Sequence, residues 1–245
     1  MKALILNSGM GTRMGVLTSE HPKCMTDLPT GETILGRQLR MLSLAGVSDI
    51  VITTGYYRGV LEEYCSSLGM PVRFTFVFNP LYDRTNYIYS MYCAREYLAG
   101  EDVVLLHGDL VFEFSVLRDI VSATRSCMKV SSTEPLPSKD FKAVVKDGRV
   151  TAVGVEFFED AMEAQALYKF RSADFGVWMD RITRFCESGR TGCYAEAALN
   201  EISSEIELFP LDVRDRLCSE VDTREDLENI GLKLRVPEPL NGAGE

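Results

Sequence analysis

The sequence predicts an α/β fold in which helices cover both faces of a mostly parallel sheet. Short apolar runs rich in β-branched residues alternate with segments of helical periodicity through the first half of the chain. The run VVLLH at 103–107 is almost entirely apolar, as expected of a central strand that is buried on both faces. This alternation indicates parallel strands joined by crossover helices.

Strands and helices alternate along the first half of the chain. We expect strands at 2–7, 49–54, 72–78, 103–107 and 128–132, and helices at 32–44, 58–68, 87–98 and 116–124. In the first of these helices, Leu35, Leu39 and Leu42 share one face, and Gly46 follows its end. The pattern therefore supplies an apolar face to cover the sheet.

The second half is predicted to be smaller and richer in strands. Asp147-Gly148 suits a type I′ turn, which predicts a hairpin at 143–155. The remaining elements are expected as a strand at 168–178, helices near 181–186 and 196–205, strands at 206–211 and 217–221, and a last helix at 224–232 capped by Thr223. The sequence predicts a single domain over residues 1–235, with halves at about 1–133 and 134–235, and a flexible tail at 236–245.

The composition is that of a soluble globular protein and limits the classes of function. The formal net charge of −10 argues against a nucleic-acid partner. No apolar run approaches the ~20 residues that span a bilayer, and the first residues resemble a strand and a loop rather than a signal peptide. We therefore expect no membrane partner and a cytoplasmic location. The seven cysteines are scattered and there are two histidines, which predicts reduced thiols rather than a zinc site.

The loop LNSGMGTRMG at 6–15 follows the first predicted strand. Gly9 and Gly11 leave backbone N–H groups open to an anion, and Arg13 adds a guanidinium group that suits phosphate. Met14 stands where a dinucleotide fingerprint needs its third glycine, and no Gly-Lys-Ser/Thr follows as in a Walker loop. The loop is a candidate phosphate site, and a plain strand-to-helix turn is the alternative.

Lys23 is a candidate second ligand for phosphate. Pro22 fixes the backbone beside it, so the ammonium group projects from a rigid position. At about 4 Å and an effective dielectric near 20, such a cation contributes roughly 4 kcal/mol against a phosphate charge. The alternative is a solvated surface lysine.

Carboxylates follow two of the predicted strands. Asp109 comes directly after the strand at 103–107, and Glu220 and Asp222 fall on the same side of the later strand by alternation. Ligands of open α/β sheets gather at the carboxyl ends of strands, and Mg²⁺ takes carboxylate and phosphate oxygens. These three residues are therefore candidate Mg²⁺ ligands. The alternatives are a loop or cap role for Asp109 and the N-cap of the last helix for Asp222.

Together, these motifs resemble the signature of the nucleotidyltransferase superfamily, whose members join a nucleoside triphosphate to a phosphorylated small molecule and release pyrophosphate. The matching segments are G-M-G-T-R at 9–13, P-K at 22–23 and G-D at 108–109. The resemblance implies a Rossmann-like, mostly parallel mixed sheet flanked by helices, with a nucleotide-binding half at about 1–133. The second half, at about 134–235, would be a small β-rich part that binds the acceptor.

Within that superfamily, the chain is most similar to bacterial CTP:phosphocholine cytidylyltransferases and to related enzymes that act on other phosphorylated alcohols or phosphonates. The matching segments are N-P-L-Y-D-R-T-N-Y-I-Y-S-M at 79–91 and E-V-D-T-R-E-D-L at 220–227. The opening Leu6-Asn7-Ser8-Gly9 and the segment P-K-C-M-T-D at 22–27 depart from the sugar-nucleotide pattern, which weakens a sugar-1-phosphate assignment.

The resemblance implies a role for each matching residue. Catalysis would depend on Lys23 and Arg13. The nucleotide would be bound by Asn7, Ser8, Gly9, Met10, Gly11, Thr12, Asn79, Thr85, Ser90 and Gly108. Mg²⁺ would be held by Asp109 and Asp222 together with Glu220. Candidates for binding the acceptor are Asn86 and Tyr82 and, from the variable second half outside the matching motifs, Asp140, Lys142, Lys169 and Glu196, some of which would select the acceptor. An N-cap role is the alternative for Asn86.

Aromatic side chains are further candidates, because choline-specific enzymes of this kind surround the quaternary ammonium with rings. The candidates are Tyr82, Tyr87, Phe141 and Trp178, and a core position is the alternative for Trp178.

The function expected from the resemblance is Mg²⁺-dependent transfer of CMP from CTP to a small phosphorylated alcohol, amino alcohol or phosphonate. Such products serve as precursors of cell-surface polysaccharides or lipids. One alternative is a sugar-1-phosphate nucleotidyltransferase that uses UTP, dTTP or GTP. A glycosyltransferase would need a D-x-D pair where this chain has G-D-L-V at 108–111, and a non-catalytic regulatory subunit would lack the lysine or the carboxylates. The expected partners are CTP and the acceptor, and a homodimer remains open.

Overall fold

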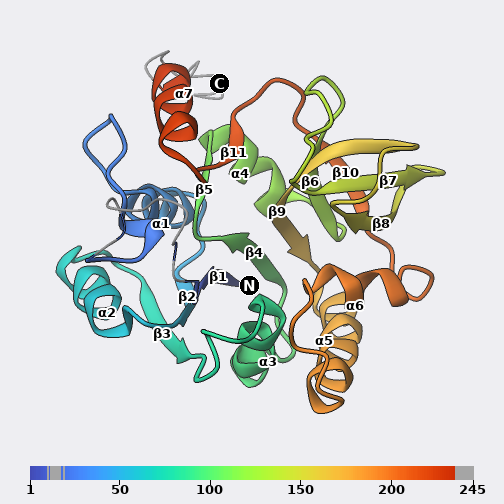
Figure 1. The fold of residues 1–245 in the computed structure, drawn as a ribbon, viewed down its shortest axis with the longest axis horizontal. Helices are drawn as coiled ribbons and strands as arrows, with labels where there is room; N and C mark the ends of the chain where they lie inside the picture. The colour runs from blue at the N-terminus through green and yellow to red at the C-terminus, as the bar shows by residue number, and fades with distance from the viewer. Residues whose placement is uncertain (10, 12–17, 19, 235–245) are drawn as a thin grey trace.

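A nine-stranded mixed sheet forms the centre of the molecule (Figure 1). The computed structural model describes residues 1–9, 11, 18 and 20–234. The strands lie in the order β10-β6-β9-β4-β1-β2-β3, and the hairpin of β7 and β8 joins the sheet through β9. The predicted α/β class and its mostly parallel, Rossmann-like mixed sheet are confirmed.

Four parallel strands from the N-terminal part of the chain form one half of the sheet. They are β1 (Lys2–Asn7), β2 (Asp49–Thr54), β3 (Arg73–Phe78) and β4 (Val103–His107). Leu6 of β1 pairs with Thr53 on one side and with His107 on the other, so the carboxyl ends of these strands meet at one edge. The residues that follow the strands are therefore neighbours in space.

Helices cover both faces of the sheet because successive side chains of each strand point to opposite faces. Ala3 and Ile5 of β1 pack on one face with α1 (Ile34–Leu44), α2 (Arg58–Ser67) and α4 (Phe114–Ser122). Leu4 and Leu6 pack on the other face, which is covered by α3 (Tyr87–Leu98), α5 (Ser172–Glu187) and α6 (Glu196–Glu201).

The β-rich second half extends the same sheet. Its strands are β6 (Cys127–Ser131), β7 (Lys142–Lys146), β8 (Arg149–Gly154), β9 (Ala161–Phe170) and β10 (Phe209–Asp212). In the turn between β7 and β8, Asp147 and Gly148 have φ values of 50° and 72°. Positive φ at both central residues is what a type I′ turn requires, so the predicted hairpin is confirmed.

The predicted strand at 168–178 is wrong. Strand β9 ends at Phe170, and helix α5 begins at Ser172. Within α5, Phe175, Trp178 and Ile182 are buried at helical spacing. The indole of Trp178 lies in the core and donates to the carbonyl of Ala195 at 3.1 Å, so the core alternative for Trp178 holds.

A second, two-stranded sheet lies beside the end of β4. Strand β5 (Leu110–Phe112), which the sequence analysis missed, pairs antiparallel with β11 (Cys218–Glu220), and Leu110 faces Glu220. Helix α7 (Arg224–Leu234) follows, and Thr223 caps it by accepting from the Asp226 backbone N–H. This small sheet brings residues near position 220 to the tip of β4.

Other differences concern element ends: α4 begins at Phe114, α6 ends at Glu201 and β10 covers Phe209–Asp212. All seven cysteines are described and are free thiols. In the part of the chain that the structure describes, no helix combines the length and apolar character needed to cross a membrane.

Candidate active site

Lys23, Asp109 and Asp222 meet at the carboxyl edge of the parallel strands. Lys23 Nζ lies 2.7 Å from Asp109 Oδ2 and also donates to Asp222 Oδ1. Lys23 opens the 3₁₀ turn η2 (Lys23–Met25), and Pro22 before it has extended backbone angles. Asp109 follows β4 and Asp222 follows β11, so three distant segments supply the cluster.

The lysine and the carboxylates of this cluster stabilise one another's charged forms. Burial alone would lower the pKa of Lys23, but the carboxylates of Asp109 and Asp222 outweigh it and raise that pKa. Burial would raise the pKa of Asp109, yet Lys23 and His107 hold that pKa below its ordinary value. Lys23 is therefore a cation and Asp109 an anion at neutral pH.

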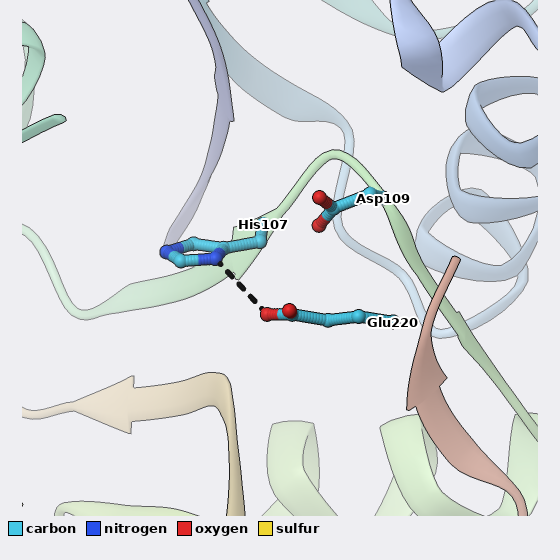
Figure 2. A group of neighbouring side chains, drawn as sticks. All are labelled: His107, Asp109 and Glu220. Carbon is cyan, nitrogen blue, oxygen red and sulfur yellow. Dashed lines mark ion pairs between the residues drawn. The ribbon is translucent and has the colours of Figure 1, made fainter. Parts of the chain in front are cut away.

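Asp109 also belongs to a second group of ionisable side chains, with His107 and Glu220 (Figure 2). His107 Nδ1 lies 3.4 Å from Glu220 Oε1, and His107, Asp109 and Glu220 each offer a ligand atom within 4.8 Å of the others. Asp140, Glu220 and Asp222 form an overlapping group, whose ligand atoms also lie within 4.8 Å of one another. Burial and repulsion from Asp109 raise the pKa of Glu220. Both groups face the same cleft.

These residues fit a divalent cation. Asp109 Oδ1 is buried and has no hydrogen-bond partner among the described residues. A buried carboxylate oxygen without a partner is costly, and a bound cation would satisfy it. Hard cations such as Mg²⁺ prefer the carboxylate oxygens that Asp109, Glu220 and Asp222 supply.

Gln38 of α1 forms hydrogen bonds to the backbone of the turn that carries Asp109. Its Nε2 donates to the carbonyl of His107 at 3.0 Å and to that of Leu110 at 2.8 Å. Within the turn, a Cβ at Gly108 would lie 1.6 Å from Asn7 Oδ1, so only glycine fits against that side chain. The hydrogen bonds from Gln38 and the close contact between Gly108 and Asn7 therefore fix the backbone position of Asp109.

A cleft of about 800 Å³ opens beside this cluster. It runs along the ends of the parallel strands and is lined by candidates for binding the nucleotide and by candidates for binding the acceptor. Among its lining residues are Ser8, Gly9, Asn79, Thr85 and Ser90 from the nucleotide set, Tyr82, Asn86 and Asp140 from the acceptor set, and Asp109, Glu220 and Asp222. A smaller adjoining cavity of about 250 Å³ is lined by Asn7, Gly9, Gly11, Lys23 and Gly108.

The loop between β3 and α3 is ordered by Asn79. Its Nδ2 donates to Ser90 Oγ at 3.0 Å and to Thr85 Oγ1 at 3.3 Å, and its Oδ1 accepts from the Leu81 backbone at 2.8 Å. At the end of the loop, Asn86 Oδ1 accepts from the Tyr87 backbone and caps α3. Asn86 thus has the N-cap role that was its alternative, although it also lines the cleft.

Aromatic rings line the far side of the cleft. Tyr194 has its ring centroid 5.2 Å from that of Phe141 and 5.8 Å from that of Tyr87. Behind them, Glu196 is 2% exposed and accepts from the hydroxyls of Tyr87 and Tyr168. Glu196 supports this wall from within the protein and does not itself line the cleft.

Besides Glu196, two further acceptor candidates, Lys142 and Lys169, do not line the cleft. Lys169 pairs with Val104 near the start of β4, because β9 is antiparallel, and its Nζ donates to the carbonyls of Val121 and Ala123. Lys142 is fully buried and donates to the Pro137 carbonyl at 2.7 Å. Both lysines satisfy backbone carbonyls and are corrected to structural roles.

Three nucleotide or catalytic candidates, Met10, Thr12 and Arg13, lie outside the described residues. Conversely, the cleft includes Tyr194, His107 and Lys139, which the sequence analysis did not select. The signal for His107 was its position two residues before Asp109 at the end of a strand. Tyr194 had a weaker signal, its place two residues before Glu196.

Comparison with known proteins supports one family. The family model described as "MobA-like NTP transferase domain" matches residues 3–135. The choline-phosphate cytidylyltransferase of Streptococcus pneumoniae is 34% identical over 242 residues, which cover 94% of this chain and 96% of that protein. The chain therefore belongs to the MobA-like NTP transferase family and is a nucleotidyltransferase.

Within that family, the chain is related to cytidylyltransferases. The CMP-5′-(3-aminopropyl)phosphonate synthase of Streptomyces rubellomurinus is 31% identical over 68% of this chain, and the CTP:phosphoglutamine cytidylyltransferase of Campylobacter jejuni is 27% identical over 50%. The matched segments span 26% and 49% of the length of these two relatives.

Solved structures support the fold. The CTP:phosphocholine cytidylyltransferase of Streptococcus pneumoniae has a TM-score of 0.77 at 21% identity and covers 95% of this chain and 98% of that one. The inositol-1-phosphate CTP transferase of T. maritima has a TM-score of 0.76 at 21% identity, with 96% of each chain covered.

Proposed function

We propose that this enzyme transfers CMP from CTP to a small phosphorylated or phosphonate acceptor and releases pyrophosphate, with Mg²⁺ as cofactor. The convergence of Lys23, Asp109 and Asp222 at the edge of the 800 Å³ cleft carries the proposal. The cytidylyltransferases among the relatives support CTP as the nucleotide.

The chain's own groups would bind and neutralise the triphosphate. Lys23 and, in the proposed reaction, Arg13 would contact its phosphate oxygens as the loop backbone at Gly9 and Gly11 approaches them. Asp109, Glu220 and Asp222 would hold Mg²⁺, which when bound would offset the negative charge of the phosphates. Gln38 would keep Asp109 in place through its two hydrogen bonds to the turn.

The proposed reaction is an in-line displacement at the α-phosphorus of CTP. An oxygen of the acceptor's phosphate or phosphonate forms the new bond, and the bond from the α-phosphorus to the bridging β-phosphate oxygen breaks. The electron pair leaves with pyrophosphate. Because the attacking oxygen is already anionic at neutral pH, no general base is needed, and catalysis depends on positioning and on charge stabilisation.

The nucleotide and the acceptor would occupy different parts of the cleft. Ser8, Asn79, Thr85 and Ser90 are proposed for the nucleotide side, because they line the cleft together from the ends of β1 and β3 and the start of α3. The acceptor side would be the aromatic wall of Tyr87, Phe141 and Tyr194, with Tyr82, Asn86 and Asp140 also available.

The acceptor side favours a small molecule whose far end carries an amino or ammonium group. Aromatic faces attract cations, and the wall is backed by the carboxylate of Glu196. Asp140 adds a carboxylate at the cleft surface. An acceptor of this kind combines an anionic end for attack with a cationic end for recognition.

A substrate panel tests the proposal. Purified protein is mixed with Mg²⁺, each of the four nucleoside triphosphates and each of several acceptors, and pyrophosphate release is measured. The acceptors are phosphocholine, phosphoethanolamine, an aminoalkylphosphonate, glycerol phosphate and glucose 1-phosphate. We expect the highest rate with CTP and an amino-bearing acceptor. A preference for UTP or dTTP with glucose 1-phosphate would favour a sugar-1-phosphate nucleotidyltransferase instead.

A further inference from the structure

His107 is a histidine in a group that otherwise consists of carboxylates. It ends β4, lines the cleft and directs Nδ1 toward Glu220, with a distance of 3.4 Å to Oε1 (Figure 2). The ligand atoms of His107, Asp109 and Glu220 lie within 4.8 Å of one another. Ligand atoms of one ion at about 2.1 Å are about 3 Å apart when adjacent and about 4.2 Å apart when opposite. The 4.8 Å bound is slightly larger than this span, so small rotations of the side chains would bring the three atoms onto one cation.

The imidazole is held in this orientation by its neighbours. The Tyr87 ring meets it edge-to-face at a centroid distance of 4.7 Å, and the Phe141 ring lies at 6.5 Å. The backbone carbonyl of His107 is fixed by Gln38. A ring that is already ordered loses little entropy when it binds a ligand.

We propose that His107 Nδ1 is a direct ligand of the cation held by Asp109 and Glu220, which makes this a mixed nitrogen and oxygen site. The proposal rests on the metal site of the proposed function and names a ligand that the carboxylate set lacks. Mg²⁺ takes oxygen ligands almost exclusively, whereas Mn²⁺ shares its preference for carboxylates but, as a transition metal, also accepts an imidazole nitrogen. The site is therefore expected to bind Mn²⁺ more tightly than Mg²⁺ in the free enzyme.

Pulsed electron paramagnetic resonance of bound Mn²⁺ tests this directly. The probe is Mn²⁺ alone, added to the purified full chain without nucleotide, and the readout is the modulation from a nitrogen nucleus bound to the metal. Protein labelled with heavy nitrogen in histidine alone assigns that signal. The chain has two histidines, so His107→Asn and the matched control His21→Asn separate the two.

We expect histidine nitrogen modulation in the wild type and in His21→Asn, and its loss in His107→Asn with about a 10-fold weaker affinity for Mn²⁺. Binding of Mn²⁺ without this modulation in the wild type would overturn the proposal, as would a signal that persists in His107→Asn. Failure of millimolar Mn²⁺ to bind the wild type would also overturn it. The wild-type measurement does not depend on a variant folding, and none of the results depends on which nucleotide or acceptor the enzyme uses.

Discussion

Lys23 Nζ lies 2.7 Å from Asp109 Oδ2, although 86 positions separate the two residues in the sequence. The same ammonium group also reaches Asp222, 199 positions away. Buried charges without partners cost several kcal/mol, so the lysine stabilises both carboxylates while no other cation is bound. A bound metal ion would take over this role and free Lys23 for the phosphates of the nucleotide.

Replacing Lys23 should therefore affect the reaction far more than the fold. We expect Lys23→Ala to lower kcat about 100-fold or more, because one cation that stabilises the transition state is lost. Steady-state release of pyrophosphate measures the effect, and circular dichroism checks the fold. Lys2→Ala is the matched control, since Lys2 lies at the opposite end of β1 and donates to the Tyr97 carbonyl. Near-normal turnover in Lys23→Ala would remove this lysine from the mechanism.

Much of this cluster could be predicted from the sequence, because strand ends can be recognised locally. The run before Asp109 is apolar and short, and β4 has the predicted bounds, Val103–His107. The parallel strands then place their carboxyl ends at one edge. What alternation could not reveal is β5, since a three-residue strand directly after a turn has no period long enough to detect.

The wrong predictions concern two lysines and one strand, and their physical causes depend on tertiary contacts that a single sequence does not show. Lys142 and Lys169 look like surface cations in a strand, but each is buried and donates to backbone carbonyls. Lysine can be buried when its ammonium group is hydrogen-bonded, and only the fold shows those partners. The segment at 168–178 contains strand-favouring aromatic residues, but packing of Trp178 in the core fixes its second part as helix.

Gln38, which is not a candidate ligand, should affect the affinity of the proposed metal site. In Gln38→Leu, the carbonyls of His107 and Leu110 lose their hydrogen bonds from Nε2, which we expect to cost about 1–3 kcal/mol of unfolding free energy. Because the turn that holds Asp109 loosens, affinity for Mn²⁺ should also fall. Urea unfolding and Mn²⁺ titration measure the two effects.

The control for Gln38 is Ser122→Ala, which removes an exposed hydrogen bond to the Asp119 carbonyl and should change stability by about 0.5 kcal/mol or less. A Gln38→Leu variant with reduced stability but unchanged Mn²⁺ affinity would show that the turn keeps its shape without this side chain.

Tyr194 should determine affinity for the acceptor and not for the nucleotide. Its ring packs against Phe141 and Tyr87 on the proposed acceptor side of the cleft. We expect Tyr194→Ala to raise the KM for an amino-bearing acceptor about 10-fold, which corresponds to one cation–π contact of about 1–2 kcal/mol. The KM for CTP should stay within a factor of two or three.

Tyr97→Ala is the matched control for Tyr194, since Tyr97 is exposed at the far end of α3. Equal increases in both KM values for Tyr194→Ala would argue against separate nucleotide and acceptor sides.

Glu32 should make stability depend on pH in the acidic range. It accepts from Arg37 at 3.1 Å and from Arg40 at 3.0 Å, both in α1. Burial would raise the pKa of Glu32, but hydrogen bonds from Arg40 and Arg37 outweigh it and lower that pKa below the ordinary value of 4.5. A carboxyl with a lowered pKa in the folded state stabilises the protein above its unfolded pKa, and that contribution is lost as the pH falls through the folded value.

We therefore expect Glu32→Gln to lower the unfolding free energy by about 1 kcal/mol or less at pH 7, since water screens a partly exposed ion pair. The difference from the wild type should shrink as the pH falls below 4.5, the ordinary pKa of the carboxyl. Urea unfolding of both proteins across this range measures it, with Glu96→Gln as the control because Glu96 forms an exposed pair with Arg95. A difference that stays constant with pH would mean that Glu32 acts through packing and not through its charge.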